Sequence, residues 1–263
     1  MQLQKFFKTH DTGGQELRKG DRFINALGQK FSVEEISRQP EDQITILVDR
    51  NDLPEIVRSL YYDMGGWLAT MAANDEREVN GNFAVYYVLS MEGGKIKPGD
   101  ELPQDEKCWI IVKALIPSYD PVFPSVTPLV PAAIWYEREA RDMFGLVPQG
   151  LPDKRRLVLP DDFPEGVYPL RKDAMDYRKR FAPYPLDEEP EYPFNEPTGS
   201  GTVDIPLGPL HITADEPGHF RLYVDGETIV DADYKMFYIH RGMEKLAENR
   251  MNYDQMGYLA ERV

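Results

Sequence analysis

The chain has 263 residues, of which 41% are hydrophobic, and a formal net charge of −15 at pH 7 with a sequence pI near 4.8. This length and apolar content predict one or two globular domains, and the negative charge argues against binding to the phosphate backbone of nucleic acids. The single cysteine, Cys108, excludes an intramolecular disulfide and any metal site built from several thiolates of these residues.

No apolar run approaches the roughly 18 residues of a membrane span, and the first residues lack the apolar core of a signal peptide. The 22 prolines are too many for a helical bundle and favour an α+β chain with long connections. We therefore expect a cytosolic, acidic and soluble protein, in which any attachment to a membrane would come through partners.

The first half of the chain predicts a sheet with helices on one face, because strand, helix and several strands follow one another. Runs rich in aromatic and β-branched residues indicate the strands, and the loop 93–104 would connect the last two as a long hairpin. Asn51 or Asp52 is a good helix N-cap, and Pro54 fits the first turn after it. In chain order, the expected elements are a helix near Glu16–Ala26, strands at Phe31–Ile36 and Ile44–Val48, a helix from about Asp52 to Met64, and strands at Trp67–Met71, Phe83–Met91 and Cys108–Ile116.

A further helix is expected over Pro131–Phe144, because proline marks a helix start and a glycine follows its end. Opposite charges with i,i+4 spacing along it form the pairs Glu137–Arg141 and Arg138–Asp142. This cluster is interpreted as a solvated or partner-facing surface rather than a catalytic one.

The rest of the sequence predicts a linker and the start of a second structural part. Residues 150–162 are expected to form a turn, a short strand and a second turn. The stretch 181–206 is proline-rich and acidic and then rich in glycine, which is typical of a linker. Beyond it, the Asp-Gly dipeptide at 225–226 lies between two apolar runs and predicts a β-hairpin. Two helices should follow, over Phe237–Asn249 and after Asn252.

Residues with catalytic potential are few. His211 and His219 flank an acidic loop that would suit a metal or proton site, although spacing alone favours a capped surface turn. Glu244 follows His240 by four residues, and the simpler interpretation is a salt-bridged helix face on which Glu244 pairs with Arg241 or with a neighbour of Glu248. The sequence contains no phosphate-binding glycine loop, no dinucleotide-binding fingerprint and no nucleophile elbow. Residue chemistry alone therefore gives no reaction.

Longer motifs resemble two subunits of respiratory complex I, and together they cover nearly the whole chain from about Ile44. Three of them closely resemble the signature of the thirty-kilodalton subunit: residues 137–145 (Glu-Arg-Glu-Ala-Arg-Asp-Met-Phe-Gly), 151–157 (Leu-Pro-Asp-Lys-Arg-Arg-Leu) and 169–173 (Pro-Leu-Arg-Lys-Asp). Three others resemble the start of the forty-nine-kilodalton subunit: Gly208-Pro-Leu-His211, the stretch Arg221–Glu227, and residues 240–246 (His-Arg-Gly-Met-Glu-Lys-Leu). That second family is shared with the large subunits of nickel–iron hydrogenases. Both signatures in this order resemble the membrane-bound, hydrogen-evolving hydrogenases of the formate hydrogenlyase type.

This resemblance implies an α+β domain of the thirty-kilodalton type over residues 1–180, the linker over 181–206, and the hairpin and helices of a hydrogenase large subunit over 207–263. It implies that the whole protein reduces protons to hydrogen, with electrons from a small iron–sulfur subunit and with membrane subunits as further partners. The residues expected to dock the N-terminal domain to these partners are Glu137, Arg138, Arg141, Asp142 and Arg171.

One loop separates hydrogenases from quinone reductases in the second family. Quinone-reducing relatives carry a His-Pro-x-x-His-Gly loop, and this chain lacks both the proline after His211 and the His-Gly pair. Hydrogenases carry a glutamate before Gly-His, and the segment Glu216-Pro-Gly-His219 matches that pattern apart from the intervening proline. The resemblance therefore implies that Glu216 relays protons to a nickel-bound thiolate. A carboxylic acid in a dry pocket has a raised pKa, which suits such an exchange near neutral pH.

Two further residues acquire roles from the same resemblance. Arg241 matches an arginine beside the iron–sulfur cluster of a partner subunit, where its charge would raise the potential of the cluster. Glu244 matches a glutamate that helps to hold a divalent ion, usually magnesium.

The nickel–iron centre is expected only in a longer protein. In the family, Glu-Arg-Val is followed by Cys-Gly-Ile-Cys, the first pair of thiolates that hold the metals, and this chain ends with Glu-Arg-Val263. We expect a UGA selenocysteine codon after Val263, and we expect the 263 residues alone to be inactive. Two alternatives stay open: a fused quinone-oxidoreductase subunit of the complex I class, which the Asp-Glu-Pro-Gly-His loop argues against, and a non-catalytic assembly or docking subunit.

Overall fold

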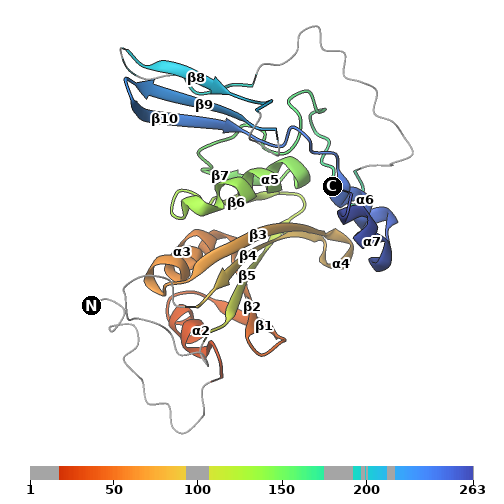
Figure 1. The fold of residues 1–263 in the computed structure, drawn as a ribbon. Coiled ribbons are helices and arrows are strands. Elements are labelled where there is room, and N and C mark those ends of the chain that lie inside the picture. Colours follow the sequence, from red (N-terminus) through yellow and green to blue (C-terminus); the bar gives the residue numbers. More distant parts are fainter. Residues whose placement is uncertain are drawn as a thin grey trace. The chain divides into compact units, whose positions relative to one another are not determined.

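The computed structural model describes residues 18–92, 107–174, 192–196, 199, 201–211 and 217–262. The chain divides into two compact units. The first contains the residues up to Arg141 and Gly145–Lys154, and the second contains Asp142–Phe144 and the residues from Arg155 onward. The domain boundaries expected at residues 180 and 206 stay predictions. Figure 1 shows helices and strands in both units, which confirms the expected mixture of the two.

A five-stranded mixed sheet forms the centre of the first unit, with strand order β1-β2-β5-β4-β3. Its strands are β1 Val33–Arg38, β2 Gln43–Val48, β3 Trp67–Glu76, β4 Asn82–Ser90 and β5 Trp109–Pro117. Strands β2 and β5 are parallel, and the other neighbouring pairs are antiparallel. The antiparallel pairing of β4 with β5 confirms the expected neighbours, and β3 extends to Glu76, beyond its expected end at Met71.

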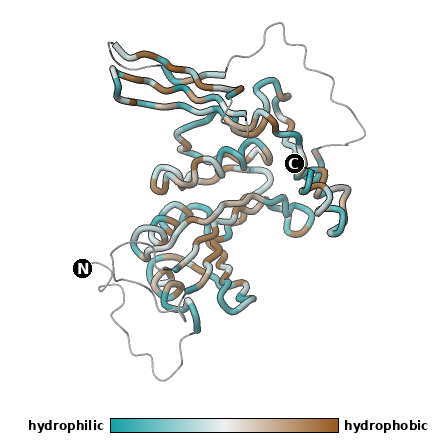
Figure 2. The backbone as a smooth tube through the Cα atoms, viewed as in Figure 1, coloured by the Kyte–Doolittle hydropathy of each residue, from teal (hydrophilic) through white to brown (hydrophobic). Residues whose placement is uncertain are grey.

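Helices cover one face of this sheet because alternate strand residues are apolar and buried. In β5, the side chains of Ile110, Val112 and Ala114 are fully buried, whereas the residues between them are partly exposed. Figure 2 shows the hydrophobic residues concentrated along these strands. Fully burying one such branched side chain contributes about 1.5–3 kcal/mol. The helices around the sheet are α2 Asp21–Gly28, η1 Arg50–Asp52, α3 Leu53–Arg58, its continuation as the π-helical turn η2 Ser59–Asp63, and α4 Arg77–Asn80.

The helical run at 50–63 begins earlier than expected. The carboxylate of Asp49 accepts a hydrogen bond from the backbone N–H of Asn51 at 2.8 Å and so caps the additional turn η1. The α-helix α3 itself follows Asp52, one of the two expected N-cap residues, whose side chain makes no capping hydrogen bond. The turn η1 thus extends the helical run by three residues before Leu53, and Asp49 binds one of the unpaired N–H groups at its start.

The helix predicted over Pro131–Phe144 is confirmed as a short turn η3 Pro131–Ala133 and the helix α5 Ile134–Phe144. It ends at Gly145, whose φ of 67° only glycine adopts readily. On either side of it in sequence, β6 Val122–Pro124 and β7 Val147–Gln149 form a parallel pair.

The short strand expected within 150–162 is wrong. These residues are all described and contain no strand. The backbone N–H groups of Leu157 and Val158 donate to the carboxylate of Asp142 at 2.8 and 3.0 Å. A side chain therefore satisfies the groups that a neighbouring strand would otherwise bind.

The second unit contains a three-stranded antiparallel sheet in the order β10-β9-β8. Its strands are β8 Val203–Leu207, β9 His219–Asp225 and β10 Thr228–Lys235, and the predicted hairpin at 225–226 is confirmed. Strand β8 occupies the last part of the stretch predicted as a linker. It forms because its backbone pairs with β9, in a register from Val203↔Val224 to Leu207↔Phe220.

The chain then forms α6 Met243–Arg250 and α7 Tyr253–Ala260. The helix start expected at Phe237 is wrong, since Phe237 (φ 63°) and Gly242 (φ 70°) adopt the left-handed conformation and helical geometry begins only at Met243. Asn252 caps α7 through a capping box with Gln255, as predicted. None of the helices in the described ranges is long and apolar enough to span a membrane.

Candidate functional site

The turn between β10 and α6 carries His240 and Arg241, and Glu244 follows in the first turn of α6. The Nε2 atom of His240 lies 2.5 Å from Oε1 of Glu244. This hydrogen bond lowers the pKa of Glu244 and outweighs burial, which acts in the opposite direction. The side chain of Glu244 is 39% exposed, so the pair is a solvent-facing one. This contact joins the turn before α6 to the helix, and it differs from the predicted helix face, in which Glu244 would pair with Arg241 or with a residue near Glu248.

Metal-binding potential in the described ranges is limited, since no group of three or more His, Cys, Asp or Glu side chains there could hold a metal ion. A nickel–iron centre requires several soft thiolates. The chain has one thiol, Cys108, which is 3% exposed and whose pKa is raised to about 11 by burial. These residues therefore do not fit a nickel–iron centre. The roles of Glu244 at a divalent ion and of the exposed Arg241 beside a cluster stay predictions.

The loop between β8 and β9 carries the expected proton relay, Glu216, which lies outside the described residues. His219, at its far end, packs its ring against Phe194 with ring centres 4.8 Å apart. Burial, and then the charge of Arg221, lowers the pKa of His219, which favours the neutral imidazole. Its Nε2 atom is buried and has no hydrogen-bond partner among the residues described.

Backbone packing brings the two ends of this loop together at Gly208 and Gly218. A Cβ on Gly208 would overlap the carbonyl oxygen of Gly218, and a Cβ on Gly218 would overlap the ring and hydroxyl of Tyr234 in β10. Both positions therefore require glycine, which has no side chain to accommodate.

Helix α5 places Glu137 in the interior of the first unit, where it is fully buried. Its Oε1 atom accepts hydrogen bonds from the Tyr87 hydroxyl at 2.8 Å and the Val126 N–H at 2.7 Å. Its Oε2 atom accepts from the hydroxyls of Ser125 at 2.5 Å and Thr127 at 2.7 Å. Four donors thus surround one carboxylate and join α5 to β4 and to the segment after β6.

The other expected docking residues also bind within their own units. Arg138 pairs with Asp153 at 3.0 Å, Arg141 donates to the carbonyl of Lys154, Asp142 accepts from Leu157 and Val158, and Arg171 donates to the carbonyl of Phe144 at 2.6 Å. A solvated face is wrong for Glu137, Arg138 and Asp142, which are at most 6% exposed. Docking stays a prediction for Arg141 and Arg171, which are partly exposed.

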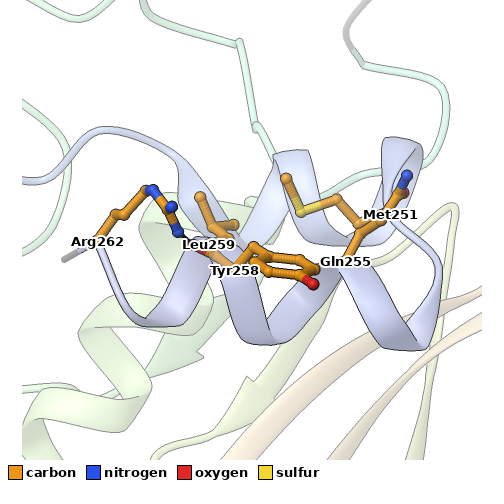
Figure 3. A pocket seen from close by; sticks show the side chains of 5 residues that line it. All are labelled: Met251, Gln255, Tyr258, Leu259 and Arg262. Carbon is orange, nitrogen blue, oxygen red and sulfur yellow. Dashed lines mark hydrogen bonds between the residues drawn. The ribbon is translucent and has the colours of Figure 1, made fainter.

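A pocket of about 470 Å³ lies along α7 (Figure 3). Its lining residues are Met251, Gln255, Tyr258, Leu259 and Arg262. The guanidinium of Arg262 donates to the carbonyl of Tyr258 at 2.8 Å. The lining is mostly apolar and includes no general base or nucleophile, so it suits packing rather than catalysis.

Comparison with known proteins identifies the family. Residues 46–179 match the family described as the 30 Kd subunit of the respiratory-chain NADH dehydrogenase, which covers half of the chain. The chain belongs to this family. The prediction of a thirty-kilodalton-type domain is therefore confirmed.

Individual relatives of this 30 kDa family member include hydrogenase subunits. The chain is 56% identical to hydrogenase-4 component G of Escherichia coli (strain K12) over 93% of its length, and 53% identical to formate hydrogenlyase subunit 5 of the same strain over 94%. It is 28% identical to the C/D-type NADH-quinone oxidoreductase subunit of Proteus mirabilis (strain HI4320) over 90% of its length. In all three comparisons the chain spans 42% of the relative, which is less than half.

Within this family domain, sequence reasoning missed the internal role of Glu137. Glu137 follows Ala133 by four residues and precedes Ala140 by three and Phe144 by seven, so all four lie on one face of the helix. The other three are all buried. A charged residue on an otherwise apolar helix face indicates a buried and fully paired group, because an unpaired charge there would be costly. That signal was present in the sequence, whereas the identity of the four donors was not.

Proposed function

We propose that this chain forms the N-terminal portion of the catalytic large subunit of a hydrogen-evolving nickel–iron hydrogenase of the formate hydrogenlyase type. The observation that carries this proposal is the identity of 56% and 53% to two hydrogenase-complex subunits over more than nine tenths of the chain. The identity to the C/D-type NADH-quinone oxidoreductase subunit is half as high. The domain of the 30 kDa family would dock the chain to partner subunits, and the complex would lie at the inner face of the membrane.

Individual residues have distinct proposed roles. Glu216 would relay protons, Arg241 would lie beside the iron–sulfur cluster of a small partner subunit, and Glu244 would contribute to a magnesium-type site. The exposure of Arg241 and the lowered pKa of Glu244 support these two assignments, because a partner needs access to the first and a cation needs the carboxylate form of the second. The thiolates for nickel and iron would come from the remaining length of a longer subunit.

A chimeric subunit tests the proposal directly. The segment of E. coli formate hydrogenlyase subunit 5 that matches this chain is replaced by the chain, and hydrogen evolution from formate is measured in cells lacking the native subunit. We expect hydrogen evolution to be restored. The matched control carries the corresponding segment of the C/D-type subunit of P. mirabilis and should evolve none. If the two chimeras evolve hydrogen equally, or if neither does, the assignment to hydrogenases over quinone oxidoreductases loses its support.

The proton relay is tested in the same chimera by Glu216→Gln, which preserves side-chain shape and removes the exchangeable proton. Hydrogen evolution should fall by about a hundredfold or more, as expected for loss of a general acid–base group. The metal content, measured by mass spectrometry of the purified subunit, should stay unchanged. Glu227→Gln in the exposed hairpin turn is the control and should keep full activity. An active Glu216→Gln chimera would exclude the relay.

A further inference from the structure

In the three-stranded sheet of the second unit, one face carries uncharged and mainly apolar side chains, and the opposite face carries the charged ones. Residues opposite one another on paired strands share a face, and successive residues alternate between faces. One face consists of three cross-strand rows: Val203–Val224–Ile229, Ile205–Leu222–Ala232 and Leu207–Phe220–Tyr234. The opposite face carries Asp204, Pro206, His219, Arg221, Tyr223, Asp231, Asp233 and Lys235.

The polar face is the one that packs within the unit. The hydroxyl of Tyr223, which is 1% exposed, donates to the carbonyl of Asn195. Asp233 is also buried and pairs with Arg155 at 2.5 Å. Covering of this face by polar contacts is unusual, because sheets normally bury their apolar side against the core.

The apolar face is exposed instead. Val203 and Ile229 are each 58% exposed, and Phe220, Ile205 and Leu207 are 38–43% exposed. Figure 2 shows hydrophobic and hydrophilic residues alternating along β8–β10, in agreement with the register. Single exposed apolar residues are common, but a contiguous apolar face three strands wide marks an interaction surface.

We propose that this face, defined by its three apolar rows and named here the apolar sheet face, is covered by an apolar surface of the remaining length of a longer subunit. The face contains no charged side chain, and such composition is typical of permanent contacts resembling a divided core. The relatives indicate that such a remaining length exists, since each of them is more than twice as long as the segment that matches this chain. A second copy of the chain is the weaker occupant, because two chains that each carry a charge of −15 repel one another.

This inference rests on the part of the proposed function that makes the chain one portion of a longer subunit. It is independent of the reaction, and it holds equally for a hydrogenase and for a quinone oxidoreductase.

Cysteine labelling measures the covering of the face directly. Val203→Cys and Ile229→Cys place thiols at its two edges, and Val79→Cys in α4, where the native residue is 82% exposed, is the matched control. The native Cys108 is buried and its raised pKa keeps it as a thiol, so it contributes little background. Each variant is labelled with a maleimide both in the 263-residue chain and in the purified subunit 5 chimera, and modification at each position is quantified by peptide mass spectrometry.

We expect the two face positions to label quickly in the chain and about tenfold or more slowly in the chimera, because covered sites react only after local opening. The control position should label at the same rate in both. Equal labelling of the face in both proteins would overturn the proposal, as would protection already present in the chain alone. Protection that appears only when the chimera is assembled with other subunits would also overturn it, in favour of a partner subunit.

The same chimera separates this inference from the proposed function. A chimera that evolves hydrogen but labels freely at the face contradicts only the covering. A chimera that evolves no hydrogen but protects the face contradicts only the assignment to hydrogenases.

Discussion

At the scale of single residues, the carboxylate of Glu137 makes the sharpest prediction. It is fully buried and accepts four hydrogen bonds, two of them from the hydroxyls of Ser125 and Thr127. Glu137→Gln preserves the shape but turns one acceptor oxygen into a donor that faces other donors. We expect the free energy of unfolding to fall by about 2–4 kcal/mol, measured by urea denaturation.

The neighbouring exposed residue provides the control for this experiment. Glu139→Gln lies on the opposite, exposed side of α5 and should change the free energy of unfolding by about 0.5 kcal/mol or less. If the two variants were equally stable, the four hydrogen bonds would not be holding α5 in place.

The thiol of Cys108 gives a second prediction at this scale. Burial raises its pKa from the ordinary value of 9.0 to about 11, so the folded protein keeps the proton that the unfolded chain begins to lose near pH 9. Alkylation at pH 9 should therefore be slower by about a hundredfold or more in the native protein than in urea, because only the thiolate reacts. The sign follows from burial of a neutral thiol: its contribution to stability is complete below pH 9 and is lost as the pH rises through about 11. Equal rates with and without urea would contradict the buried position.

At the scale of elements, the closing of the loop between β8 and β9 depends on Gly208. Its φ is 92°, and a Cβ there would overlap the backbone of Gly218. Gly226 in the β9–β10 turn also has a positive φ, of 61°, but the space around it is open. Gly226→Ala should therefore cost only the conformational strain, about 1 kcal/mol. Gly208→Ala adds a backbone clash and should cost about 3 kcal/mol or more.

Hydrogen exchange of the β8–β10 amides measures this difference locally. Gly208→Ala should accelerate exchange along the strands, whereas Gly226→Ala should affect mainly the turn. If both variants exchanged alike, the close approach of Gly208 to Gly218 would not constrain the sheet.

Elements fixed by local signals could be predicted from the sequence, and elements fixed by distant contacts could not. The Asp-Gly hairpin, the helix ending at Gly145 and the Asn252 cap each depend on residues a few positions apart, and all three predictions are confirmed. The strand expected within 150–162 failed because Asp142 binds its N–H groups from another element. The start of α6 failed because helical periodicity does not reveal a left-handed residue such as Phe237.

The candidate site follows the same rule. The spacing of His240 and Glu244 was visible in the sequence, but their contact is made across the left-handed Gly242 rather than along a helix, so helical periodicity did not predict it. The partners of Glu137 could not be predicted either, because Tyr87 lies 50 residues earlier in the sequence and reaches the carboxylate only through the packing of α5 on the sheet. Exposure of the apolar sheet face was also hidden, since the alternation in β8–β10 does not say which face is covered.

At the scale of the whole molecule, charge governs how stability depends on pH. The net charge of −15 at pH 7 makes the folded chain repel itself, and that repulsion decreases as the pH approaches the pI near 4.8. Paired carboxylates act in the opposite sense at lower pH. The pKa values of Glu35, Glu76, Asp233 and Glu244 all lie below their ordinary values. For Glu76, burial raises the pKa, but the hydrogen bonds from Lys113, Tyr86 and Asn80 together lower it by more than burial raises it.

These two effects predict a profile with a maximum. Because the folded pKa values are depressed, the stability that these carboxylates contribute is present above their ordinary values of 3.8–4.5 and is lost as the pH falls through the folded values. The urea midpoint should therefore hold or rise from pH 7 to about 5 and fall steeply below about 4. Added salt of about 0.5 M should raise the midpoint at pH 7, where repulsion is strong, and have little effect near the pI.

Glu76→Gln should lower stability at pH 7 and flatten the acid limb, because Lys113 loses its partner at 2.8 Å. A midpoint that falls steadily from pH 7 downward would show that the paired carboxylates, rather than the net charge, dominate over the whole range.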